Sequence, residues 1–258
     1  MQIQILASGS SGNAIFFELG HTRLLIDAGI SARRIERGLA SIGIKAGDLD
    51  AILITHEHTD HISGVEVLAR KHHLPVYARP RTWNMLRFKD KLDRDCRWEL
   101  PDSMGIGQVE VVPFPISHDA ADPVGFCLYY HRSKYVVATD LGVVTPVVRE
   151  AMAYADTVVL ETNHDLDMLN SGPYPFYLKR RISSAVGHLS NSDAADLLTG
   201  IPRKSSMQVF LAHLSRQNNL PELAERTVSQ RLQEHGCEVG YEVILHMTYP
   251  DQISGYCR

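Results

Sequence analysis

A short stretch of the chain concentrates side chains that bind metal ions. It runs Thr55-His56-Glu57-His58-Thr59-Asp60-His61 and directly follows the apolar residues 51–54. Neutral imidazoles and carboxylates are the ligands that borderline divalent cations prefer. A strand that ends here presents three imidazoles and a carboxylate from one turn. The pattern His-x-His-x-Asp-His therefore predicts a hydrolase site for two metal ions, and a solvated histidine-rich turn is the alternative.

Other candidate ligands each stand just past the end of an expected strand. They are His118, Asp140, Glu161 and His213, which follow residues 109–113, 135–138, 157–160 and 209–212. Loops at strand ends are where α/β proteins assemble their sites. We therefore expect these side chains to converge with His56 on one edge of the sheets. A lone histidine is more often an ordinary core or surface residue, so the order and placement of the whole set carry this prediction.

The elements that position these residues follow from the hydrophobic pattern. Expected strands cover residues 2–6, 14–19, 22–26, 51–54, 75–78, 109–113, 124–130, 135–138, 157–160, 209–212 and 243–247, and expected helices cover 31–43, 64–70, 145–154, 193–198 and 220–235. Residues 81–97 are polar, mixed in charge and helical in pattern, and we interpret them as a lid or a surface insertion. Neither a repeat nor a low-complexity segment interrupts this order. We expect one domain over residues 1–258.

Net charge, cysteine pattern and the lack of long apolar runs indicate what kind of protein this is. The formal net charge is −4, so no overall cationic field favours nucleic acid, although a local basic rim could bind it. The four cysteines are scattered without a Cys-x-x-Cys pair, as in a reduced cytosolic protein. The first residues lack a secretory signal, and no apolar run reaches membrane-spanning length. We therefore expect a cytoplasmic protein without membrane association.

The ordered set of candidate ligands resembles the metallo-β-lactamase superfamily over most of the chain. The resemblance implies an α/β fold, a four-layer αβ/βα sandwich of two mixed β-sheets flanked by helices. It implies that His56, His58 and His118 bind one metal ion, that Asp60, His61 and His213 bind a second, and that Asp140 bridges them. Asp27 would orient a ligand imidazole through a hydrogen bond. The expected ions are Zn²⁺, with Mn²⁺ or Fe as alternatives.

A second group of motifs is similar to the phosphodiesterase branch of this superfamily, which contains RNase Z and the phosphonate-pathway phosphodiesterase. Gly187-His188-Leu189-Ser190-Asn191 stands one helix and one strand before His213-Leu214-Ser215. In that branch, the residue at the position of His188 protonates the leaving oxygen and the residue at the position of Glu161 orients it. Asp60 would belong to the catalytic set as a metal ligand. The alternative is that His188 only supports the helix that follows.

Within that branch the chain is identified as a member of the YycJ/WalJ group. The motifs that carry this are Leu6-Ala7-Ser8-Gly9-Ser10-Ser11-Gly12-Asn13, Glu161-Thr162-Asn163-His164-Asp165 and Leu211-Ala212-His213-Leu214-Ser215. The resemblance implies a 5′→3′ exonuclease that hydrolyses the phosphodiester bonds of DNA with a metal-bridging hydroxide and a histidine acid. One alternative is a hydrolase of a small phosphodiester, or of a thioester as in glyoxalase II. Another is a metal-binding regulator without catalysis.

Three features indicate contacts to a phosphate substrate. The loop with Ser10, Ser11 and Asn13 could direct backbone N–H groups and hydroxyls at an anion, although a plain tight turn explains it equally well. Lys179 and Arg180 stand beside the aromatic residues at 174, 176 and 177, which suits phosphate contacts and base stacking, although they could form an ordinary solvated helix face. His164, within the motif Glu161-Thr162-Asn163-His164-Asp165, is a further candidate for substrate contact.

Overall fold

The computed structural model describes residues 1–204 and 206–257. The chain divides into two compact units. The first comprises Met1–Pro113, Ala120–Val124 and the segment from Tyr249 onward, and the second comprises Phe114–Asp119 and Gly125–Thr248. We describe each unit by itself, and the expectation of one domain over residues 1–258 stays a prediction.

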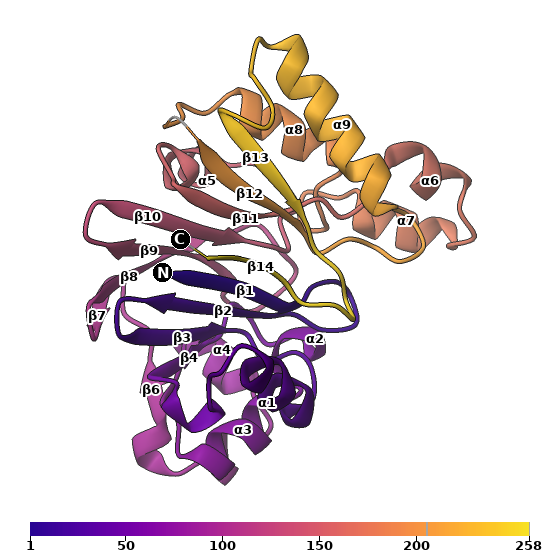
Figure 1. The fold of residues 1–258 in the computed structure, drawn as a ribbon. Helices are drawn as coiled ribbons and strands as arrows, with labels where there is room; N and C mark the ends of the chain where they lie inside the picture. Colours follow the sequence, from indigo (N-terminus) through magenta and orange to yellow (C-terminus); the bar gives the residue numbers. More distant parts are fainter. Residues whose placement is uncertain (205, 258) are drawn as a thin grey trace. The chain divides into compact units, whose positions relative to one another are not determined.

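The first unit is built on a seven-stranded mixed sheet with the order β14-β1-β2-β3-β4-β5-β6 (Figure 1). Its strands are β1 Gln2–Ala7, β2 Ala14–Leu19, β3 Thr22–Ile26, β4 Ala51–Leu53, β5 Val76–Ala78, β6 Arg97–Glu99 and β14 Ser254–Cys257. The strands β14, β1, β2 and β3 are antiparallel neighbours, and β3 to β6 are parallel. Gly20, at a φ of 64°, supplies the left-handed conformation that the two-residue turn between β2 and β3 requires.

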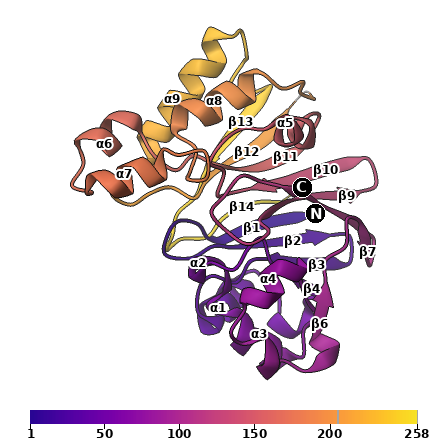
Figure 2. The ribbon, with the colours of Figure 1, turned by 180° about the vertical axis from the view of Figure 1, so that it is seen from behind.

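Helices beside this sheet bury its apolar face. They are α1 Ala32–Ser41, α2 Thr59–Ile62, α3 Val65–His72 and α4 Pro80–Met85, with the 3₁₀ turns η1 Ala46–Asp48, η2 Lys89–Lys91 and η3 Arg94–Cys96. The helices α1 and α3 lie side by side in both views (Figures 1 and 2). Their residues Ile35, Leu39 and Leu68 join Phe16 and Ile52 of the sheet in one core. Burial of these side chains is the main force that holds the helices on the sheet.

The interpretation of residues 81–97 as a lid or surface insertion is wrong. The helix α4 begins at Pro80, a position where proline is favoured. It ends at Leu86, which has extended backbone angles. Beyond it, the chain forms two 3₁₀ turns and then β6, which pairs with β5. Trp83 and Phe88 are buried in the core of the first unit, so tertiary packing overrides the helical pattern of this segment.

The second sheet has the order β13-β12-β11-β10-β9-β8-β7 and is also mixed. Its strands are β7 Met104–Ile106, β8 Val109–Pro115, β9 Val124–Tyr130, β10 Ser133–Ala138, β11 Thr157–Glu161, β12 Met207–Ala212 and β13 Val243–Met247. The strands β10 to β13 are parallel neighbours, and β9 and β10 form the expected hairpin. Every residue of β12 is buried, as the near-continuous apolar run of a central parallel strand predicts.

The helices described in the second unit are α5 Pro146–Met152, α6 Leu166–Ser171, α7 Phe176–Ile182, α8 Asn191–Thr199 and α9 Pro221–Glu234. The long helices α8 and α9 pack against each other, and α9 also contacts β13 (Figure 1). Asp165 caps α6 by accepting the backbone N–H of Met168, and Ser190 forms a capping box with Asp193 at the start of α8. Ser31 stands at the start of α1 as expected but makes no side-chain cap hydrogen bond.

The fold class predicted from the sequence, two mixed β-sheets flanked by helices, is confirmed. The sequence did not indicate the short elements β6, β7, β14 and α6, whereas the helix considered for Lys179 and Arg180 is present as α7. Within the described ranges 1–204 and 206–257, no helix combines the length and apolar character that crossing a bilayer requires.

Candidate metal and catalytic centre

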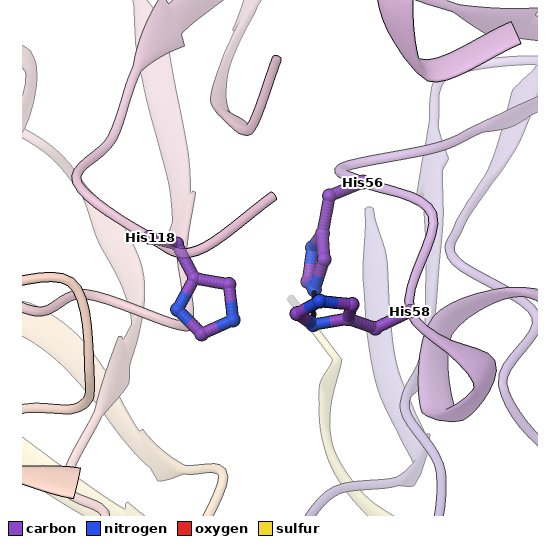
Figure 3. A group of neighbouring side chains, drawn as sticks. All are labelled: His56, His58 and His118. Atoms are coloured by element: carbon purple, nitrogen blue, oxygen red, sulfur yellow. Dashed lines mark hydrogen bonds between the residues drawn. The ribbon is translucent and has the colours of Figure 1, made fainter. Parts of the chain in front are cut away.

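The histidine-rich segment of the first unit leaves β4 and turns into α2. His56 and His61 are fully buried, whereas His58 and Asp60 are partly exposed. The ring nitrogens His56 Nε2 and His58 Nδ1 lie 3.1 Å apart, and the two rings meet edge to face (Figure 3). Two imidazole nitrogens at this separation share a proton or direct both lone pairs at one cation. The pair therefore fits the start of a metal site.

Asp27 fixes the orientation of His61. Its Oδ2 lies 2.7 Å from His61 Nδ1, and it accepts the backbone N–H of Thr55 at Oδ1 and the Thr55 hydroxyl at Oδ2. Burial raises the pKa of Asp27, and the charge and hydrogen bond of His61 oppose that rise. Because a carboxylate accepts, Nδ1 of His61 carries the proton and Nε2 carries the lone pair. The contact expected of Asp27 is present, and its role toward a metal stays a prediction.

The carboxylate of Glu161 contacts two histidine rings and two backbone N–H groups of the second unit. Glu161 ends β11 and is completely buried. Its Oε1 lies 2.9 Å from His188 Nδ1 and 2.8 Å from His213 Nδ1, and its Oε2 accepts the backbone N–H groups of Leu141 and Leu189. Burial alone would raise the pKa of Glu161, but the charges and hydrogen bonds of His188 and His213 outweigh it and lower the pKa to about 2. Glu161 is therefore an ionised acceptor with both oxygens engaged.

Asp140 and His118 complete the polar group of the second unit. Asp140 Oδ1 lies 3.7 Å from His188 Nδ1, 3.6 Å from His213 Nδ1 and 3.8 Å from His118 Nε2. Ligand atoms of Asp140, Glu161, His188 and His213 all lie within 4.8 Å of one another, a spacing that could hold a metal ion. His118 Nδ1 lies 3.1 Å from the carbonyl of Gly187, so Nδ1 is the donor and Nε2 the lone-pair nitrogen. Burial lowers the pKa of His118, which favours the neutral ring that binds a cation.

Three of the predicted site residues have left-handed backbone angles. The φ values are 58° at Asp27, 61° at Asp140 and 56° at His213. Asp27 and His213 directly follow β3 and β12, and Asp140 follows β10 after one residue. Non-glycine residues rarely adopt positive φ, and such conformations cluster at functional sites. At each of these residues the backbone turns just after the strand, and the side chain leaves the strand at that point.

The residues expected to contact substrate divide into two kinds. Asn13 and His164 are each 1% exposed, which argues against direct contact with a polymer. Asn13 Nδ2 instead lies 3.2 Å from His61 Nε2, so Asn13 positions the histidine segment. Ser10 and Ser11 are exposed at the tip of their loop.

Lys179 and Arg180 lie on α7 and line a cavity of about 350 Å³ on its surface. The Nζ of Lys179 donates to the carbonyl of Asn170 at 2.7 Å, and the guanidinium of Arg180 lies over the ring of Phe176. Their placement is compatible with substrate contact, which stays a prediction.

Sequence reasoning missed two contacts that shape this centre. Glu161 was expected to orient His188 only, yet the same oxygen also faces His213 Nδ1. Asn163 is buried and donates to the carbonyl of His213 at 2.8 Å. Its place in the motif Glu161-Thr162-Asn163-His164-Asp165 was the available signal. The first contact orients the ring of His213, and the second holds its backbone carbonyl.

Comparison with known proteins places the chain in a family. The model of the Beta-lactamase superfamily domain matches residues 22–214. The chain is 39% identical to Exodeoxyribonuclease YycJ of Bacillus anthracis, covering 97% of this chain and 96% of that protein. It is also 39% identical to Exodeoxyribonuclease WalJ of Streptococcus pneumoniae, covering 96% and 94%.

Solved structures agree in fold at low sequence identity. The metallo-β-lactamase fold protein YhfI from Bacillus subtilis is 15% identical with a TM-score of 0.73, covering 98% of each chain. Zn²⁺-bound PqqB from Methylobacterium extorquens is 15% identical with a TM-score of 0.72, covering 98% of this chain and 99% of that chain. The chain belongs to the metallo-β-lactamase superfamily, in its YycJ/WalJ branch.

Proposed function

We propose that this protein is a metal-dependent phosphodiesterase that degrades DNA from its 5′ end. The observation that carries the proposal is the pairing of His188 with Glu161 at 2.9 Å in a group that otherwise consists of metal-ligand side chains. Hydrolysis of a phosphodiester needs a proton for the leaving oxygen, and this pair is built to hold one. The curated relatives at 39% identity carry the name exodeoxyribonuclease, which supports DNA as the substrate.

The donor set fits divalent cations. It consists of imidazole nitrogens and carboxylate oxygens, and hydrogen bonds at Nδ1 of His61 and of His118 turn Nε2 of each ring toward a ligand role. The family pattern, transferred to this chain, assigns His56, His58 and His118 to one ion, Asp60, His61 and His213 to a second, and Asp140 to both. We propose two Zn²⁺ ions, with Mn²⁺ or Fe as alternatives. When bound, such ions lower the pKa of a coordinated water and stabilise charge on the attacking and leaving oxygens.

His188 is the proton donor in this proposal. Its side chain is 15% exposed, whereas those of Glu161, His213 and Asp140 are 3% exposed or less. It is therefore the member of this group that a substrate reaches most easily. With Nδ1 held by Glu161, the proton that His188 transfers is the one on Nε2. The ionised Glu161 keeps the ring in one orientation and balances the positive charge that a proton-donating imidazole carries.

The alternatives differ in what they require of this pair. A thioester hydrolase of the glyoxalase II kind does not need a histidine acid, because a thiolate leaves without protonation. A regulator without catalysis does not need the complete ligand set. A hydrolase of a small phosphodiester would use the same chemistry as a nuclease, so only a comparison of substrates separates these two.

The test uses the full chain with each candidate cation. Oligonucleotides labelled at the 5′ or the 3′ end, as single and double strands of DNA and RNA, are digested beside bis(p-nitrophenyl) phosphate and a thioester. We expect mononucleotide release from the 5′ end of DNA, abolished by chelation and restored by metal. His188→Ala should keep the bound metal and lose most of kcat. Cleavage that persists after complete metal removal, or turnover of the thioester alone, would contradict the proposal.

A further inference from the structure

The surface of α7 carries two largely exposed aromatic side chains. Phe176 and Tyr177 are 74% and 75% exposed. Large aromatic rings usually contribute to cores or interfaces, because burying their area is strongly favourable. We call the group formed by these two rings with Lys179, Arg180, Asn170 and Ser183 the α7 patch. Arg180 is exposed like the two rings, and Lys179 is partly exposed.

The cations of the α7 patch are not neutralised by acidic side chains. Across residues 1–204 and 206–257, no carboxylate forms an ion pair with Lys179 or Arg180, whereas their neighbour Arg181 is paired with Asp119 at 2.7 Å. Arg180 lies 5.8 Å from the centre of the Phe176 ring, in a cation–π arrangement. Cations near a helix C-terminus also stabilise the helix. That explains the charges but not the two exposed rings.

Most of the α7 patch lines a cavity large enough for a ligand, and Tyr177 lies outside that lining. Asn170, Phe176, Lys179, Arg180 and Ser183 line about 350 Å³. This volume lies within the range of roughly 300–1,000 Å³ that small-molecule sites occupy. The lining combines an aromatic ring, two cationic side chains and two neutral polar side chains. A base with its sugar and phosphate could contact all three kinds of side chain.

A short, hydrogen-bonded segment joins the α7 patch to the proposed proton donor in the same unit. The carbonyl of Ile182, the last residue of α7, accepts the backbone N–H of His188 at 2.8 Å. Gly187 packs so closely on this turn that a Cβ there would lie 2.2 Å from the carbonyl oxygen of Arg181. Asp119, the ion-pair partner of Arg181, directly follows His118. The end of α7 and the backbone of His188 are therefore joined by a short, closely packed turn.

We propose that the α7 patch binds single-stranded DNA next to the cleaved bond, with bases stacked on Phe176 and Tyr177 and phosphates on Lys179 and Arg180. The proposal rests on the proposed function and names how that site holds its polymer. Stacking on a protein ring needs a base whose face is open, and paired bases inside a duplex do not offer one. Lys179 and Arg180 have no carboxylate partner among the described residues, so their charge can meet an anion. Cations beside exposed rings suit the phosphates and bases of a nucleic acid.

The test separates polymer binding from bond cleavage. Two double variants are made, Phe176→Ala with Tyr177→Ala and Lys179→Ala with Arg180→Ala. The KM for end-labelled single-stranded DNA should rise about tenfold or more in each, while kcat/KM for bis(p-nitrophenyl) phosphate stays at the wild-type value. In a His188→Ala background, anisotropy should show the same loss of DNA affinity. Removing the two cations should also reduce the slope of log Kd against log salt by about 1.4.

Matched controls come from the first unit and from another exposed ring. Lys89→Ala with Arg94→Ala removes the same charge from a cavity beside Trp83 and Trp98, and Tyr241→Ala removes a ring that is 68% exposed. Both controls should keep the wild-type KM for DNA. Equal losses in the controls, a wild-type KM in the α7 variants, or a loss confined to duplex DNA or to RNA would overturn this inference. A wild-type protein that cleaves no DNA would instead overturn the proposed function.

Discussion

Nδ1 of His213 lies 2.8 Å from Oε1 of Glu161, the same oxygen that faces Nδ1 of His188 at 2.9 Å. One carboxylate thus orients both a proposed metal ligand and the proposed proton donor. Any change at Glu161 should therefore alter metal binding and proton transfer together.

Glu161→Gln tests this coupling. The amide nitrogen of glutamine would face either the two ring N–H groups or the backbone N–H groups of Leu141 and Leu189, so buried donors would lose their acceptor. We expect Zn²⁺ affinity to fall about 10–100-fold, kcat to fall with it, and stability to drop by about 1–3 kcal/mol. Metal content, kcat on bis(p-nitrophenyl) phosphate and urea unfolding measure the three effects. The exposed Glu225→Gln is the matched control, and a variant with wild-type metal content and kcat would contradict the coupling.

Asp27→Asn tests the orientation of His61 without disturbing the backbone. Asparagine tolerates the positive φ of 58° at this position, so the turn after β3 should persist. The amide can place a donor opposite His61 Nδ1, which favours the tautomer with its proton on Nε2. We expect Zn²⁺ affinity to fall about 10–100-fold with little change in Tm, as measured by competition with a chromophoric chelator and by calorimetry. Asp27→Ala adds backbone strain and should lower Tm as well. Unchanged affinity in Asp27→Asn would refute the orienting role.

His246 should make stability depend on pH. Burial lowers its pKa below the ordinary value of 6.5, where the ring stacks on Phe210 and Nε2 contacts Gln208 Oε1 at 2.8 Å. The unfolded chain then binds a proton more readily than the folded chain, so this contribution is present above pH 6.5 and is lost as the pH falls through the folded pKa. Urea unfolding between pH 8 and 5 should show a smaller acid loss in His246→Gln than in the wild type. Parallel curves for the two proteins would exclude His246 as a source of this dependence.

The cysteines should differ in reactivity. Cys96, Cys127 and Cys237 are buried, and Cys257 is exposed. Burial raises the pKa of all three buried thiols, that of Cys127 to about 11, and a thiol reacts only as the thiolate. Iodoacetamide at pH 7.5 should therefore modify one thiol per native chain and four in denaturant, as counted by mass spectrometry. Cys257→Ser should remove the native reaction, and modification of Cys127 at a comparable rate would contradict the argument.

Features that depend on residues close together in the sequence could be predicted, and features that depend on residues far apart could not. The segment with His56, His58 and His61 was recognisable because its ligands are consecutive and follow an apolar strand. The contact of Glu161 with His213 was not, because it depends on the parallel register that sets Glu161 opposite Ala212 in β11 and β12. A pairing between strands 51 residues apart leaves no local pattern in the sequence.

Short elements were missed for a related reason. The strand β14 has four residues and exists through its pairing with β1, in a register that sets Ile3 opposite Tyr256. The helix α6 has six residues, too few for a clear amphipathic period. Residues 81–97 had a helical pattern, yet the burial of Trp83 and Phe88 decided their structure. Long, periodic segments such as α9 agreed with expectation within one residue at each end.

The left-handed turns at Asp27, Asp140 and His213 limit which amino acids mutation can fix at these positions. A β-branched replacement such as valine or threonine would strain the main chain as well as remove the carboxylate or imidazole, whereas asparagine or glycine would remove that group and leave the turn intact. Descendants of this gene that lose metal binding but still fold should therefore accumulate asparagine and glycine there. A deep mutational library can be sorted once for folding and once for turnover. At these three positions, the variants that fold without turnover should be mainly asparagine and glycine.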